Sequence, residues 1–252
     1  MSYSPNDALT VVQNLVHGVP TAAIQAQACD QVNSMIWTFY PWAWTIKSLT
    51  PINCSQGTQD YAPTNTDILR PLKLRLVRTD VTPNEFREMA LLANLSPELT
   101  RTGGLETITS CGWYASGPFI RLMYAASVSG TQTLQIQGEY QAVPTTITAA
   151  NITSTFAQLG IGNNGLPDRY FNGFVEGLLW KLYQLSDDPR AGTMQYAKNG
   201  SYMRQYSGQL GIFMDALLQM ARTEDLASGD QFEFPAQPLG VGRSYWPGLY
   251  GV

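Results

Sequence analysis

The sequence is poor in charged residues and in histidine. Lysine, arginine, aspartate and glutamate make up only 13% of its 252 residues, about half the usual share of a soluble domain. His17 is the only histidine, so a catalytic triad or a histidine-rich metal site could be built only around this residue, which we expect at the end of a short helix. The G-x-S-x-G, HExxH and Walker A strings do not occur. We therefore expect no enzymatic activity, no metal and no cofactor.

Basic clusters, long apolar runs and paired cysteines are also missing. The net charge is −4 and no run rich in lysine or arginine exists, so we expect no tight binding to DNA. No apolar run approaches the length of a membrane span, and the first ten residues lack the pattern of a signal peptide. Cys29, Cys54 and Cys111 are widely spaced and odd in number, which fits neither a disulfide framework nor a zinc site. We expect three free thiols in a reducing cytoplasm.

Two patterns could carry chemistry. Residues 160–165 satisfy GxGxxG, but a dinucleotide site needs a strand before the motif and a βαβ unit around it. Helices are expected to follow here, so we interpret this stretch as a flexible loop. Paired carboxylates could act as in glycosidases, and the nearest candidates are Asp60 with Asp67 and Asp187 with Asp188. The second pair is expected in a hinge between helices, where capping is the ordinary role.

The longest helical periodicity runs from Pro167 to Ala227. Apolar residues recur at steps of three and four, which predicts two long antiparallel helices joined near Asp187 and Pro189. The first carries Phe174, Leu178 and Leu182, and the second, expected from Ala191 onward, carries Phe213, Leu217 and Ala221. Two further helices are expected near the N-terminus, beginning after Ser4 and after Thr21.

Between about Thr45 and Tyr140 the apolar period changes to two. Leu72, Leu74 and Leu76 alternate with other residues, and the stretches 119–124 and 131–140 are rich in β-forming residues. One helix, over Thr82 to Ala93, is expected to interrupt these strands. The predicted fold class is therefore α+β. It comprises a helical bundle from residues 1–44 and 151–227, a β-rich sandwich-like or barrel-like insertion at 45–150, and an extended tail at 228–252.

Three features predict contact with partners. Gly173 and Gly177 allow another helix to approach closely, although packing within one chain is the more ordinary use of such a pair. Trp180 is expected on the polar side of its helix, so it is either in a second contact or half exposed, and an aromatic there favours an interface. The tail combines proline and glycine with aromatic residues that are expected to anchor it to a partner: Phe232, Phe234, Tyr245, Trp246 and Tyr250.

The order of several motifs resembles a known family. An early helix ends in the aromatic segment Met35 to Trp44, and Tyr61-Ala62-Pro63 follows with Asp67. The β-region ends in Gly138-Glu139-Tyr140 and Val143-Pro144, and Leu166-Pro167 then opens the two long helices. Over about residues 6 to 226 this order resembles the phage head-to-tail adaptors, the group that includes podovirus tail tubular protein A. The aromatic tail departs from the family pattern.

The resemblance implies a virion protein of the phage neck, assembled in the host cytoplasm. It implies a homo-oligomeric ring of twelve copies below the portal protein and above a tail or nozzle protein, with DNA passing through the channel. The residues alone leave a second class open, a glycan-binding module that presents Trp113, Tyr114 or Tyr124 from the β-rich insertion. A third is a carboxylate-based glycan hydrolase in a tail assembly.

Overall fold

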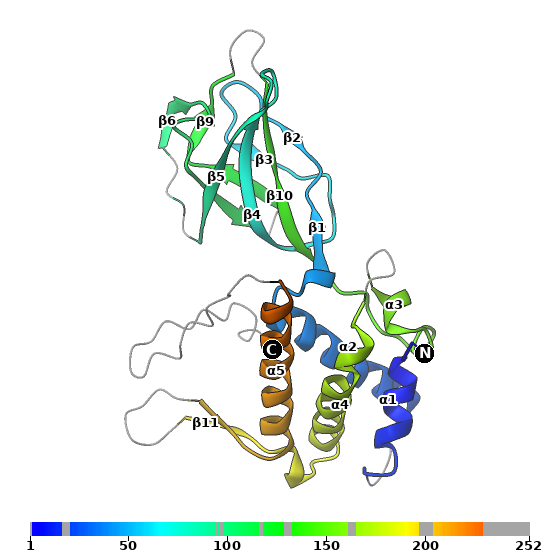
Figure 1. Cartoon of the computed structure of the whole chain (residues 1–252). Coiled ribbons are helices and arrows are strands. Elements are labelled where there is room, and N and C mark those ends of the chain that lie inside the picture. Colours follow the sequence, from blue (N-terminus) through cyan, green and yellow to red (C-terminus); the bar gives the residue numbers. More distant parts are fainter. Residues whose placement is uncertain are drawn as a thin grey trace. The chain divides into compact units, whose positions relative to one another are not determined.

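The chain folds into two compact units. The computed structural model describes residues 2–16, 21–93, 95, 98–115, 118–128, 133–160, 165–196 and 204–228. The first unit, here called the helical unit, comprises Met1–Thr45 with Pro144–Val252, and the second, here called the sheet unit, comprises Ile46–Val143. The two units are described separately below (Figure 1).

The sheet unit is built on a curled eight-stranded sheet. Its strand order is β1-β10-β4-β5-β7-β8-β3, with β2 paired to β10. The bounds are β1 Ile46–Ser48, β2 Ile52–Asn53, β3 Asp60–Tyr61, β4 Ile68–Arg78, β5 Glu85–Leu92, β7 Ser110–Tyr114, β8 Phe119–Leu122 and β10 Leu134–Ala142. A separate pair consists of β6, Glu98–Gly103, and β9, Tyr124–Ala126. All pairings are antiparallel except β5 with β7 and β6 with β9.

Alternation along the long strands places the core on one face of the sheet. Leu76 of β4 lies opposite Ile136 of β10, and both side chains are fully buried. Arg75 and Gln137 also lie opposite one another, and their side chains point to the other face, where Arg75 Nη2 donates to Gln137 Oε1 at 3.4 Å. The period of two in the sequence therefore corresponds to one buried and one solvated face.

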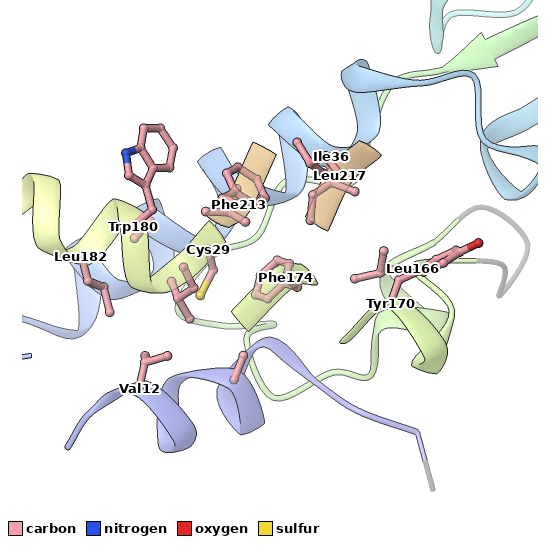
Figure 2. Packing of buried hydrophobic residues seen from close by; sticks show 14 of the residues in the cluster. Val12, Cys29, Ile36, Leu166, Tyr170, Phe174, Trp180, Leu182, Phe213 and Leu217 are labelled. Atoms are coloured by element: carbon pink, nitrogen blue, oxygen red, sulfur yellow. The ribbon is translucent and has the colours of Figure 1, made fainter. Parts of the chain in front are cut away.

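The helical unit is organised around α4, Phe171–Leu185. Helices α1, Pro5–Val12, α2, Ala22–Phe39, and α5, Gly208–Ser228, each pack against α4. Shorter elements are α3, Phe156–Leu159, and the 3-10 turns η1 Ala43–Thr45, η2 Asp168–Tyr170 and η3 Pro189–Ala191. The core between the helices contains fully buried Phe174, Leu178 and Phe213 (Figure 2).

Local signals explain where α1 and α2 begin and end. Ser4 and Asp7 form a reciprocal capping box at the start of α1, with Pro5 in the first turn. Helix α2 ends before Pro41, and the chain then turns so that Trp42 Nε1 donates to the carbonyl of Ile36 at 2.6 Å. This bond satisfies a carbonyl near the end of the helix and fixes a buried indole under it.

The predicted fold class is wrong. The structure is a mixed fold dominated by the eight-stranded sheet, and α-helices are few among the described residues, with α3, α4 and α5 in the C-terminal half. Two segments assigned to helices are the source of the error. Residues 82–93 contain strand β5, and the second long helix begins at Gly208 rather than Ala191.

Glycines with a left-handed backbone explain the late start of α5. Gly192 and Gly208 have φ angles of 76° and 56°, which do not fit a right-handed helix. The chain between them includes the antiparallel strands β11, Met194–Tyr196, and β12, Arg204–Tyr206. A Cβ atom on Gly192 would lie 1.8 Å from the carbonyl oxygen of Ser207, so only glycine allows the two ends of this hairpin to approach.

Among the helices that the structure describes, none is both long and apolar enough to cross a membrane.

Candidate functional site

The two glycines predicted at an interface lie between α4 and α5 of the same chain. A Cβ atom on Gly173 would lie 2.5 Å from Met220 Sδ, and one on Gly177 would lie 2.6 Å from Phe213 Cε2 and 2.7 Å from Val32 Cγ1. The close approach that this spacing predicts therefore exists, but the neighbours are α5 and α2 of the same unit. Neither glycine offers a free surface to another subunit.

Trp180 is part of the same intramolecular contact. Its side chain is only 8% exposed, and its ring stacks on that of Phe213 with 5.8 Å between centroids. Lys181 Nζ lies 5.5 Å from the centroid of the Trp180 ring. Of the two possibilities expected for Trp180, a second contact or partial exposure, the structure shows a second contact, because α5 covers the side of α4 that carries it.

The tail residues predicted to bind a partner, Phe232, Phe234, Tyr245, Trp246 and Tyr250, lie outside the described residues. The helix before them is firmly attached to the rest of its unit. Glu224 Oε1 accepts hydrogen bonds from Tyr170 Oη at 2.8 Å and Arg169 Nη2 at 2.6 Å. One residue later, Asp225 accepts a hydrogen bond from the hydroxyl of Tyr40.

An uncovered apolar face lies on strand β5. Phe86, Ala90 and Leu92 point away from buried Met89 and are exposed, and exposed Glu88 lies between Phe86 and Ala90 on the same face. Phe86 is 61% and Leu92 41% exposed, and Arg75 of the neighbouring strand lies over the Phe86 ring at 5.7 Å. A strand in the middle of a sheet normally hides such side chains, so this face fits contact with another molecule.

Sequence reasoning missed this face because residues 82–93 were assigned to a helix. The signal was present as an alternation of apolar Phe86, Ala90 and Leu92 with Glu85, Arg87 and Met89. This signal is weak, because the charged Glu88 interrupts the apolar positions and the apolar Met89 interrupts the charged ones. Only the pairing of β5 with β4, in which Phe86 lies opposite Val77, resolves the ambiguity.

The acidic residues proposed for catalysis are engaged by basic groups. Both oxygens of Asp60 accept from Arg121, at 2.6 Å each, and the hydrogen bond from Arg121 lowers the pKa of Asp60. A glycosidase acid needs a raised pKa so that it holds a proton near neutral pH. Asp60 therefore lacks the environment of a general acid.

Asp67 is held at one end of the sheet unit. Lys47 Nζ donates to Oδ2 at 2.6 Å and Tyr140 Oη donates to Oδ1 at 2.7 Å. Burial opposes ionisation of Asp67, but the hydrogen bonds from Lys47 and Tyr140 outweigh it and lower the pKa of the carboxyl. The backbone carbonyl of Asp67 accepts from the amide of Val143 at 2.8 Å. Asp67 thus fastens β1, β10 and the last residue of the unit to one another.

The other acidic pair has a structural role in the turn after α4. Asp188 caps η3 by accepting from the amide of Arg190 at 2.9 Å, and its carboxylate also accepts from the Arg190 guanidinium. Asp187 has a φ angle of 52°, a conformation that aspartate tolerates better than most residues. The capping interpretation of this pair fits these contacts.

Tyr114, one of the three aromatic residues proposed for glycan binding, lies in a ring stack. Tyr114 and Phe119 stack on each other with centroids 4.7 Å apart, and the Arg121 guanidinium lies over both rings at 5.1 and 5.2 Å. A sugar needs a free ring face to stack on. Phe119 covers one face of the Tyr114 ring, and Arg121, which Asp60 holds in place, lies close to both rings.

The described residues offer little for a small ligand or a metal ion. A shallow cavity of about 220 Å³ in the sheet unit is lined by Arg78, Glu85, Glu106 and four uncharged residues. Arg78 already pairs with Asp80 at 3.0 Å and with Glu85 at 3.7 Å. No cluster of three metal-ligating side chains occurs in the part of the chain that the structure describes. His17 and positions 161–164 of the glycine motif lie outside that part.

The cysteines and the basic residues are likewise not arranged for chemistry. Cys29, Cys54 and Cys111 are free and buried, and burial raises their pKa values to about 12, 11 and 12. A thiol of this kind stays protonated and is a weak nucleophile. Basic side chains are paired with acids in several places, namely Lys47, Arg78, Arg87, Arg121, Arg169 and Arg190.

Exposed apolar side chains and paired charges are therefore the main features of the described surface. In comparisons with known proteins, the chain matches no protein-family model and no curated sequence.

Proposed function

We propose that the protein is a structural adaptor subunit of a phage neck. It forms a ring below the portal, continues the DNA channel and joins the head to the tail. The resemblance of its motif order to head-to-tail adaptors suggests this role. The observation that carries it is the uncovered apolar face of β5, where Phe86 is 61% exposed. An apolar strand face of this kind is stabilised when a neighbouring protein covers it.

The distribution of charge supports passage of DNA without tight binding. The chain carries a net charge of −4, and the ion pairs in both units neutralise many of the basic groups that could hold phosphates. Affinity for duplex DNA depends on free lysine and arginine that release counterions from the backbone. A channel built from such subunits lets DNA slide. We expect a dissociation constant for duplex DNA weaker than micromolar at physiological salt.

The contacts of Asp60, Asp67 and Asp188 support a structural role over glycan hydrolysis. The stacking of Tyr114 on Phe119 counts against the use of Tyr114 in glycan binding. No described contact favours the alternatives, and the adaptor remains our proposal.

The assembly state of the purified chain tests the proposal. Native mass spectrometry and electron microscopy of negatively stained particles are expected to show closed rings, with the copy number given by the mass. The portal protein of the same virus is added in a second sample, because the ring can depend on it. A strictly monomeric mass in both samples would contradict the adaptor role.

The tail provides a separate test of the portal contact. We expect a chain that ends at Ser228 to remain folded, since Glu224 and Asp225 anchor α5 upstream of the cut. The truncated chain should lose binding to the portal in a pull-down, whereas the full chain binds. Unchanged binding, or loss of the folded circular dichroism spectrum on truncation, would show that the tail does not serve as the portal anchor.

A further inference from the structure

The helical unit exposes apolar side chains on two outer helices. Val11, near the end of α1, and Leu15, in the turn that follows the helix, are 52% and 49% exposed, and Ile212 on α5 is 52% exposed. Figures 1 and 2 both show α1 and α5 on opposite sides of α4. The unit therefore has two separate apolar patches, one made by Val11 and Leu15 and the other by the single residue Ile212.

Both patches lie toward the same end of α4. The start of α1 is beside the start of α4, because the Tyr3 amide donates to Asp168 Oδ1 at 3.2 Å and the Tyr3 ring stacks on Phe171. Val12 and Leu182 point toward one another further along (Figure 2). Helix α1 thus runs in the same direction as α4, and Val11 and Leu15 lie near the end of α4.

Helix α5 runs in the opposite direction. Its late residue Glu224 contacts Tyr170 at the start of α4, whereas Phe213 packs on Trp180 in the second half of α4. Ile212 therefore lies at nearly the same height along α4 as Val11 and Leu15. Arg222 lies toward the other end, as Asp7 does on α1.

The outer faces of α1 and α5 are complementary at matching heights. On α1 and the turn after it the exposed positions run from Asp7 through Thr10 and Val11 to Leu15, an axial span of about 12 Å at the helical rise of 1.5 Å per residue. On α5 they run from Arg222 through Gln219 and Asp215 to Ile212, a span of about 15 Å by the same rise. Asp7 on α1 thus lies level with Arg222 on α5, and the apolar Val11 and Leu15 lie level with Ile212.

We propose that the outer face of α1 docks on the outer face of α5 of a second copy of the chain. The two patches differ, so the contact is heterologous, and repetition around an axis along the helices closes a ring. Such a rotation keeps each residue at its own height. Leu15 and Val11 then meet Ile212 of the next copy, Asp7 approaches its Arg222, and the paired helices run antiparallel. The proposal deepens the adaptor role and depends on it.

Disulfide cross-linking tests the pairing and its register. Leu15→Cys and Ile212→Cys are made as separate proteins, and so are Thr10→Cys and Gln219→Cys. The native cysteines are buried and contribute no background. After mixing and mild oxidation, Leu15→Cys with Ile212→Cys and Thr10→Cys with Gln219→Cys should give covalent dimers. Each single variant oxidised alone should give at least tenfold less covalent dimer.

An out-of-register pair serves as the control. Leu15→Cys mixed with Arg222→Cys places the thiols at opposite ends of the contact, so the yield should fall at least tenfold below that of Leu15→Cys with Ile212→Cys. Equal yields from all pairs would indicate random collision and overturn the proposal.

Polar substitution supplies an independent readout. Val11→Asp and Ile212→Asp should each weaken ring assembly at least tenfold in sedimentation velocity. Leu185→Asp is the matched control, because Leu185 is also apolar and 45% exposed but lies outside both faces. If rings form and neither substitution affects them, the ring contact lies elsewhere while the adaptor proposal stands. If the chain stays monomeric and no pair cross-links at any concentration, both proposals fail.

Discussion

The hydroxyl of Tyr170 donates a hydrogen bond of 2.8 Å to Oε1 of Glu224 and joins the start of α4 to the last turns of α5. Arg169 donates to the same oxygen at 2.6 Å. The Glu224 side chain is only 8% exposed, whereas that of Arg169 is 54% exposed. The carboxylate is therefore buried but connected through Arg169 to solvent, which limits the cost of its charge.

Removing the Glu224 carboxylate should destabilise the helical unit. Glu224→Ala leaves the buried Tyr170 hydroxyl without its acceptor, and we expect a loss of about 2–3 kcal/mol. Glu224→Gln keeps an acceptor and should lose less. Urea unfolding followed by circular dichroism measures both. Thr223→Ala, at an exposed neighbouring position, is the control and should change stability by less than about 0.5 kcal/mol; an equal effect there would contradict the assignment.

The two glycines of α4 should respond differently to alanine. At Gly177 the new Cβ meets Phe213 and Val32 at 2.6 and 2.7 Å, and we expect a loss of about 1–3 kcal/mol from overpacking. At Gly173 the neighbour is Met220 Sδ at 2.5 Å, part of a flexible side chain that can move. The gain in helix propensity, up to about 1 kcal/mol, should offset most of that strain. Thermal unfolding of both variants tests the contrast, which fails if Gly173→Ala is the more harmful.

Stability should decline in alkaline solution. The usual thiol pKa is 9.0, and burial raises those of Cys29 and Cys111 to about 12. Because the folded pKa is the higher one, the stability is fully present below pH 9 and is lost as the pH rises toward 12. By pH 10 each thiol should cost about 1 kcal/mol.

Urea unfolding at pH 8, 9 and 10 measures this loss. Cys111→Ala serves as the matched variant, since it removes one titrating group and should flatten the pH dependence even though it lowers stability at pH 8. An identical pH dependence in the two proteins would rule out a contribution from Cys111.

The apolar face of β5 should matter for association more than for folding. Phe86→Ser removes an exposed ring, so the urea midpoint of the isolated subunit should change little, whereas assembly with its partners should weaken at least tenfold. Met89→Ser on the other face is the contrast, because Met89 is 6% exposed. It should lower the free energy of unfolding by about 2 kcal/mol or more. Sedimentation and unfolding measured side by side distinguish the two effects.

Local sequence signals were sufficient where residues close together in the chain determine a helix or a strand. Ser4 followed by Pro5 predicted the start of a helix, because a cap satisfies backbone groups within three residues, here through Asp7. The stripe of Phe174, Leu178 and Leu182 predicted α4 for a similar reason, since a helical period places all three on one face. The alternation of Leu74 and Leu76 likewise predicted β4.

Tertiary structure decided the elements whose local pattern is ambiguous. The segment that forms β5 has a cap-like start and scattered apolar residues, and it is a strand because β4 supplies hydrogen bonds along it. Residues 194–206 contain a hairpin because Gly192 and Gly208 turn the backbone out of the helical region. The spacing of apolar residues in the sequence cannot reveal either effect, since one depends on a distant strand and the other on the backbone angle of a single residue.

The candidate interaction surface was likewise determined partly by the sequence and partly by the tertiary structure. The sequence by itself determined that Gly173 and Gly177 permit a close helix contact, that charges are few, and that the three cysteines are not paired. Only the tertiary structure decided that α5 of the same chain fills the glycine face and buries Trp180. It also left Phe86, Val11, Leu15 and Ile212 exposed. The physical reason is that a residue's type and spacing set what it can pack against, whereas the positions of the other elements determine whether that place is already occupied.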